Sequence, residues 1–136
     1  MTNIKTILII MLLASFFITT SSCKKEDKEY TSISGQWRCD EQSPMGMSSF
    51  TIDIEESTNN SSIYAIYNIN NKGHEERAFA TLIGDSLIIE SQFIGNTMID
   101  IEGYGVVTND KKLMTLYYTT KSNEGVFDIN ASCTHM

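Results

Sequence analysis

Short stretches in which apolar and polar residues alternate cover most of the chain after residue 33. Alternation is clearest at Phe50, Ile52 and Ile54, which are separated by polar residues. A period of two is typical of a strand that buries one face. The pattern predicts eight strands, at residues 35–41, 48–56, 62–70, 76–83, 86–93, 97–107, 112–120 and 125–133.

The gaps between the predicted strands are short and rich in Gly, Asn and Asp, which tolerate positive φ in turns. Connections this short join antiparallel neighbours, because parallel pairing needs a long crossover. We therefore expect an all-β fold, an up-and-down meander of eight strands. A meander of this kind removes its exposed edges by closing into a barrel, with the first strand paired to the last.

The alternation also predicts which side chains face the barrel interior. Two strands have a clear apolar face, formed by Leu87, Ile89 and Phe93 in the fifth and by Phe127, Ile129, Ala131 and Cys133 in the last. The third and seventh runs are apolar on both faces, so their inward face stays open.

An eight-stranded barrel has an interior that side chains just fill, or that holds one small ligand. In the expected register, small inward residues that leave space are Ala65, Ala78 and Ala80, and large ones that fill it are Phe50, Phe93, Phe127 and Met98. Because the loops are too short to build a deep cup, we favour a filled or shallow interior.

The first 22 residues differ from the rest of the chain. Lys5 precedes an apolar run of 12 residues at 7–18. This run is shorter than the about 20 residues that a membrane-spanning helix needs, and it is typical of a signal peptide. Small residues at 19–22 then lead to Cys23.

This arrangement resembles the lipobox of bacterial lipoproteins, although Thr20 stands where an aliphatic residue is preferred. The resemblance implies a signal peptide at 1–22, a lipidated Cys23 with a flexible tether at 23–33, and a barrel domain at 34–136. Two or more acyl chains give stable membrane attachment. Ordinary secretion with an incidental cysteine is the alternative.

Lysines followed by acidic residues at 24–29 resemble the surface-export signal of Bacteroidetes lipoproteins. This second resemblance implies an outer-membrane protein that faces the cell surface, with the periplasmic face as the alternative. Without residues 1–22, nine basic and 17 acidic residues remain, a net charge of −8. Such a charge argues against a nucleic-acid partner and favours a basic one.

Two cysteines remain once lipidation uses Cys23. Cys39 shares a face with Trp37, and Cys133 shares a face with Ile129. Closure of the barrel brings both to the inner side of one seam, which predicts a Cys39–Cys133 disulfide in an oxidising compartment. A structural zinc site needs four ligands, and with only two histidines and no C-x-x-C motif we expect no metal and no cofactor.

Gly35-Gln36-Trp37 resembles the G-x-W that opens the first strand of lipocalins and their calycin relatives. The resemblance implies a lipocalin-like barrel whose tryptophan plugs the closed end. Two features depart from it, because no T-D-Y motif follows and no arginine lies in the last strands to stack on Trp37. The aromatic ligand-binding candidates are Trp37, Tyr64, Tyr67, Tyr117 and Tyr118, with Tyr104 as a further tyrosine.

We expect no enzyme. Carboxylates occur at Asp40–Glu41 with Asp53, and at Asp100 with Glu102, but we place them on outer faces or turns. Glycosidase chemistry needs such a pair across a cleft. The nucleophile elbow G-x-S-x-G is absent from the sequence.

Three other residues are expected at the surface. His74 follows a glycine in a turn, and His135 is one residue from the C-terminus, where we expect fraying. Asp85-Ser86-Leu87 resembles the O-glycosylation site of Bacteroidetes proteins, which makes Ser86 a candidate for modification.

Three functions fit these observations. The first is a membrane-anchored lipoprotein whose barrel binds a small apolar or glycan-like ligand. The second is a protein-binding barrel, such as an inhibitor of a basic hydrolase, and the third is a structural accessory lipoprotein without a ligand. A cavity with polar groups at its mouth would favour the first, and a solid core with an acidic outer patch the second.

Overall fold

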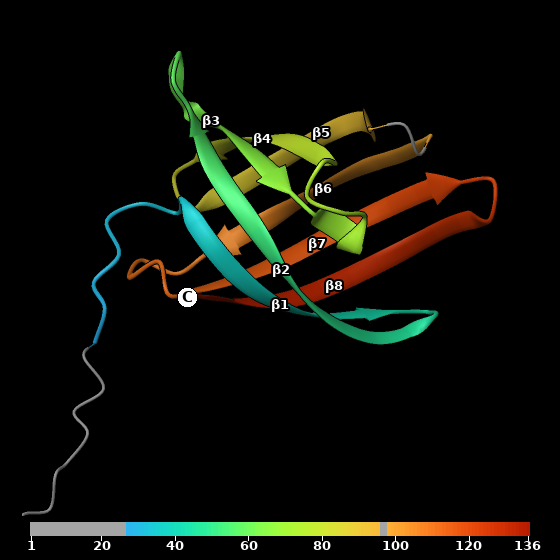
Figure 1. Cartoon of the computed structure of the whole chain (residues 1–136), viewed down its shortest axis with the longest axis horizontal. Coiled ribbons are helices and arrows are strands. Elements are labelled where there is room, and N and C mark those ends of the chain that lie inside the picture. The colour runs from blue at the N-terminus through green and yellow to red at the C-terminus, as the bar shows by residue number, and fades with distance from the viewer. Residues whose placement is uncertain (1–26, 96–97) are drawn as a thin grey trace, which may run out of the picture.

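Eight antiparallel strands follow one another around a closed barrel in the computed structural model, which describes residues 27–95 and 98–136 (Figure 1). The elements are β1 (Gly35–Ser43), β2 (Gly46–Ser57), β3 (Asn60–Tyr67), the short 3-10 helix η1 (Ile69–Asn71), β4 (Arg77–Ile83), β5 (Ser86–Ile94), β6 (Ile99–Val107), β7 (Leu113–Ser122) and β8 (Gly125–His135). Each strand pairs with its neighbour in sequence, and β1 also pairs with β8. The predicted meander and its closure are confirmed.

The two ends of the barrel differ in what they contain. The β1–β2, β3–β4, β5–β6 and β7–β8 connections lie at one end, which we call the mouth. The other connections lie at the opposite end, the closed end, together with the C-terminus and the segment that leads into β1 (Figure 1). The chain therefore approaches the barrel from the end opposite the mouth.

The seam between β1 and β8 is closed by hydrogen bonds and by a covalent bond. Cys39 and Cys133 lie directly opposite each other in the β1–β8 register and are fully buried. They form a disulfide across 94 residues of sequence. The predicted bridge is confirmed, because closure brings two inward positions of the first and last strands together.

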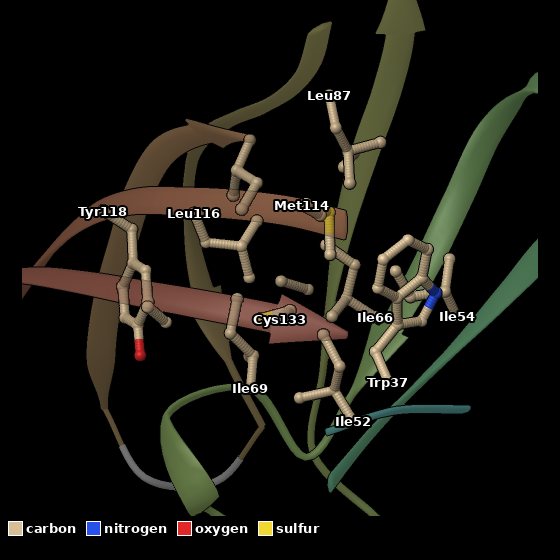
Figure 2. Close-up of a cluster of buried hydrophobic side chains, with 14 of the residues drawn as sticks. Trp37, Ile52, Ile54, Ile66, Ile69, Leu87, Met114, Leu116, Tyr118 and Cys133 are labelled. Atoms are coloured by element: carbon tan, nitrogen blue, oxygen red, sulfur yellow. The ribbon is translucent and has the colours of Figure 1, made fainter. Parts of the chain in front are cut away.

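Apolar side chains from all eight strands fill the interior, and Figure 2 shows part of this cluster extending from Trp37 to Tyr118. The structure assigns the two strands that the sequence left open. Tyr64 and Ile66 face inward on β3, whereas Met114, Leu116 and Tyr118 do so on β7.

Two glycines on β6 allow β7 to pack closely against it. A Cβ at Gly103 would overlap the backbone oxygen of Tyr117, and a Cβ at Gly105 would lie 2.8 Å from a methyl carbon of Leu116. Non-bonded atoms do not approach this closely, so neither position has room for a side chain larger than that of glycine.

β5 departs from simple alternation after Ile89. Ile89 pairs with Gly103 and Gln92 pairs with Ile101, so β5 has one residue more than β6 between these pairs. This bulge exchanges the inward and outward positions of β5 beyond it. Ile94 is therefore buried, whereas 71% of Phe93 is exposed. The prediction that Phe93 faces the interior is wrong.

The other residues expected in the interior divide into two groups. Ala78 and Ala80 are buried, and Phe50 and Phe127 pack partly buried against the core. The predictions for two others are wrong. Met98 is exposed beside the β5–β6 turn, and Ala65 lies on the outer face of β3, opposite Phe79 of β4.

Gln92 replaces part of the ladder between β4 and β5, which covers only three residue pairs near their turn. Its amide oxygen accepts a hydrogen bond from the N–H of Phe79, and its amide nitrogen donates to the carbonyl of the same residue, both at 2.7 Å. The Gln92 nitrogen also donates to the carbonyl of Glu90 at 2.9 Å. Beside the bulge, the Gln92 side chain thus provides Phe79 with the two hydrogen bonds that the backbone of a neighbouring strand would form.

Replacing Gln92 with alanine is expected to lower the free energy of unfolding by about 1–2 kcal/mol. Three hydrogen bonds are lost, each with a modest net contribution because water replaces part of it at this exposed site. Urea unfolding followed by circular dichroism measures the change. Gln36→Ala, on the exposed outer face of β1, is the control and should change stability by less than about 0.5 kcal/mol. Equal stabilities of the two variants would contradict the role of Gln92.

The strand predicted at 62–70 ends early because of an asparagine. Asn68 has a φ of 58°, and Asn70 and Asn71 also adopt positive φ, which turns the chain out of the sheet into η1. The buried Asn68 side chain donates to the carbonyl of Thr51 and accepts from the N–H of Gly73, both at 2.7 Å. The turn therefore has fixed geometry at the mouth.

Candidate functional site

The closed end is sealed by an aromatic stack. Trp37 is fully buried, and its indole N–H donates to the carbonyl of Ile33 at 2.8 Å. The His135 ring lies between Trp37 and Tyr30, with ring centroids 4.3 and 3.8 Å away. A Cβ at Gly35 would lie 2.8 Å from a ring nitrogen of His135, so this position requires glycine.

His135 is therefore an ordered part of the core, and the expectation that it frays is wrong. Only 8% of it is exposed, and its ring nitrogens lie 2.9 and 3.2 Å from the carbonyl oxygens of Lys111 and Ser34. From the last strand, His135 and not an arginine stacks on Trp37. The backbone N–H of Met136 also donates to the carbonyl of Gln36, which holds the C-terminus in place.

The five aromatic candidates do not converge on one pocket. Trp37, Tyr64 and Tyr118 face the interior and are at most 5% exposed, whereas Tyr67 and Tyr117 lie on the outer face. Trp37 lies at the closed end, far along the barrel from Tyr118 (Figure 2). Of the three inward rings, Tyr118 is the one whose hydroxyl contacts the polar groups of the mouth.

A cavity of about 330 Å³ lies at the mouth, above the filled core. This volume is at the small end of the range of ligand pockets in proteins. Polar groups contribute much of its wall, including Glu41, Ser48, Asn70, Thr120 and Ser122. Apolar surface comes from Met45, Met47, Ile99, Phe127 and Ile129. The cavity thus combines hydroxyl and amide groups with apolar patches, and Glu41 is the buried one of its two carboxylates.

A hydrogen-bonded chain of three side chains lies at this cavity. The Tyr118 hydroxyl donates to Oε2 of Glu41, and the amide of Asn70 donates to the Tyr118 oxygen at 3.4 Å. Burial, followed by the hydrogen bond to Glu41, raises the pKa of the Tyr118 hydroxyl above its ordinary value. Tyr118 therefore keeps its proton and fixes one oxygen of the Glu41 carboxylate.

Glu41 was missed as an interior residue. The expectation that it lies on an outer face or turn is wrong, because β1 remains regular through Ser43 and Glu41 is only 7% exposed. The signal was present in the sequence, since Glu41 has the same parity as Trp37 and Cys39. An acidic side chain is expected in solvent, and Tyr118, which donates a hydrogen bond to Glu41, is 77 residues away in sequence.

The other expected carboxylates lie outside, as predicted. Asp53 is 3.1 Å from the exposed ring of His74, and Asp100 accepts from the Ser91 hydroxyl at 2.9 Å. Glu102 pairs with Lys121 at 2.6 Å. None of these pairs faces the mouth cavity.

A second hollow lies on the outer face of β6, β7 and β8. Its volume is about 620 Å³, and it is more open than the mouth cavity. Tyr104 and Tyr117 stack there with ring centroids 5.2 Å apart, beside Asp128 and Asn130. Of the two residues, Tyr104 is 47% exposed and Tyr117 is 40% exposed.

Of the two predicted modification sites, the structure describes only Ser86. Cys23 lies outside the described residues. Ser86 is the first residue of β5, directly after the Gly84–Asp85 turn, and is partly exposed. Its glycosylation remains a prediction.

Within residues 27–95 and 98–136, no group of three or more His, Cys, Asp or Glu side chains is arranged to hold a metal ion. In the same ranges, no helix is long and apolar enough to cross a membrane. Comparisons with protein-family models, with curated proteins and with solved structures find no match to this chain. The class that the fold defines is a small disulfide-closed β-barrel with a polar cavity at one end.

Proposed function

We propose that the protein is a membrane-anchored lipoprotein with a lipocalin-like barrel that binds one small glycan-like ligand at its mouth. The observation that carries this proposal is the cavity of about 330 Å³ above the filled core, with Glu41, Asn70 and Thr120 in its wall. A cavity with polar groups at its mouth is what separates a ligand-binding barrel from a purely structural one. Its size suits a single small molecule.

The character of the walls favours a glycan-like ligand over a purely apolar one. Side chains from all eight strands occupy the interior below the mouth, so no apolar channel runs through the barrel. An apolar ligand in the mouth would strip water from hydroxyl, amide and carboxylate groups without replacing their hydrogen bonds. A hydroxyl-rich ring satisfies these groups and packs its C–H face on Phe127 and Ile129.

The proposed anchor agrees with the orientation of the barrel. The apolar run at 7–18 and the small residues before Cys23 support lipidation, and the Cys39–Cys133 bridge suits an oxidising compartment. Tyr30 of the segment that leads into β1 stacks on His135 at the closed end. A lipid on Cys23 would therefore attach the barrel by its closed end and leave the mouth facing away from the membrane.

Native mass spectrometry of the mature protein, purified in detergent from its host, tests the proposal. We expect one small molecule to be retained with the lipidated chain. Thr120→Phe should abolish retention, because Thr120 lies in the cavity wall and is 6% exposed. The matched control is Thr115→Phe, on the outer face of the same strand, which should leave retention unchanged.

Four results would contradict all or part of the proposal. If no small molecule is retained, or if Thr120→Phe retains it as well as Thr115→Phe does, the mouth is not the binding site. Retention of a stoichiometric basic protein would instead support the protein-binding alternative, which the net charge of −8 allows. A mature mass without a lipid on Cys23 would overturn the anchor alone.

A further inference from the structure

The mouth cavity contains a buried carboxylate with no positive partner in the described part of the chain. Glu41 is 7% exposed and faces inward on β1. In residues 27–95 and 98–136, Lys112 pairs with Asp27, Lys121 pairs with Glu102, and the His74 ring lies 3.1 Å from Asp53. None of them involves Glu41.

The hydrogen bonds of Glu41 leave one carboxylate oxygen available. Oε2 accepts from the Tyr118 hydroxyl, and the described residues provide no hydrogen-bond partner for Oε1. Asn70 supports Tyr118 from the other side, so the carboxylate is held in a fixed position at the cavity wall. A fixed acceptor of this kind binds a ligand donor without having to be ordered first.

The charge of the cavity wall favours a cation. Glu41 and Glu124 contribute two carboxylates, and Lys72 contributes one ammonium group that forms no ion pair with either. Burying a carboxylate without a counter-charge is costly, and a charge-assisted hydrogen bond recovers part of that cost. A ligand that carries its own positive charge supplies the missing partner.

We propose that the ligand carries a protonated amine that donates to Glu41. This inference rests on the proposed function and narrows the ligand class to a hydroxyl-rich small molecule with an ammonium group, the chemistry of an amino sugar. The hydroxyl and amide groups of the wall receive its hydroxyls, and the overall negative charge of the protein attracts it.

Titration calorimetry of the mature lipidated protein in detergent, with glucosamine and glucose as probes, tests this inference. The two sugars differ only at C2, where glucosamine has an ammonium group and glucose a hydroxyl. We expect glucosamine to bind about tenfold to a hundredfold more tightly, the effect of one hydrogen bond between charged groups.

Glu41→Gln should remove this preference and lower glucosamine affinity to that of glucose, because the amide keeps an acceptor for Tyr118 but carries no charge. Asp40→Asn is the matched control, since it removes one carboxylate from the neighbouring outer position of β1, and it should keep the preference. N-acetylglucosamine, whose nitrogen is uncharged, should bind the unaltered protein as weakly as glucose, which tests the charge without a mutation.

The outcomes separate the two proposals. Equal binding of glucosamine and glucose, or an unchanged preference in a folded Glu41→Gln variant, overturns the amine inference and leaves the proposed function in place. If neither sugar binds, the molecule that native mass spectrometry finds bound to the protein tests the amine inference. A retained compound with a basic nitrogen supports the inference, and one without it overturns the inference alone. If nothing is retained, both proposals fail.

Discussion

Removing the disulfide, by replacing both Cys39 and Cys133 with alanine, is expected to lower the free energy of unfolding by about 4–5 kcal/mol. The bridge closes a loop of 94 residues, so it removes much of the conformational entropy of the unfolded chain. It also joins β1 to β8, which in the described part of the chain are the one pair of hydrogen-bonded strands that do not follow each other in sequence. Guanidinium unfolding followed by circular dichroism measures the loss.

Two controls make this result specific. A reducing agent should lower the stability of the unaltered protein by a similar amount and leave the alanine variant unchanged. Ser132→Ala, on the outer face of β8 next to Cys133, should change stability by less than about 0.5 kcal/mol. An alanine variant as stable as the oxidised protein would show that strand pairing alone closes the seam.

The fold was predictable because closure follows from two local properties of the chain. Period-two alternation defined the strands, and short polar gaps required antiparallel neighbours. Once eight such strands close, the inward positions of the first and last must meet. The Cys39–Cys133 bridge followed from closure of the barrel, from the inward parity of both residues and from the assignment of Cys23 to lipidation.

Errors in the interior arose where parity changes within a strand. The bulge before Gln92 places Phe93 outside and Ile94 inside. The residue pattern of that segment does not predict the bulge. Runs that are apolar on both faces, as around Tyr64, carry no parity signal. Their inward face depends on neighbours such as Ala78, which pairs with Ile66.

The mouth could be predicted less well than the barrel. The alternation of β1 places Glu41 on the inward face, like Trp37 and Cys39. An acidic residue near a strand end is usually solvated, however, and the prediction followed this rule. The burial of Glu41 depends on Tyr118 of β7, which Asn70 of η1 supports, and both residues are far from Glu41 in sequence. A site assembled from three distant segments has no local signature.

The closed end differs from the mouth, because stacked aromatic rings occupy its centre. Trp37 contacts the C-terminal strand through His135 and the incoming segment through its hydrogen bond to Ile33. The same ring packs against the interior cluster (Figure 2). One side chain thus joins the two chain ends to the core, so its loss should affect all three.

Replacing Trp37 with alanine is expected to lower the free energy of unfolding by about 3–5 kcal/mol. The change removes a fully buried indole, leaves a cavity at the closed end and uncovers the face of the His135 ring that stacks on Trp37. Urea unfolding measured by circular dichroism is the appropriate assay, because Trp37 is the only tryptophan and fluorescence is lost with it.

Two further variants show whether the plug acts through packing. Trp37→Phe keeps an aromatic ring but loses the N–H that donates to Ile33, so we expect a loss between those of the unaltered protein and the alanine variant. Leu113→Ala, at a side chain that is 52% exposed on the outer face of β7, should cost less than about 1 kcal/mol. If Trp37→Ala costs no more than Leu113→Ala, the closed end is held by the disulfide and the β1–β8 ladder, and the tryptophan is not its plug.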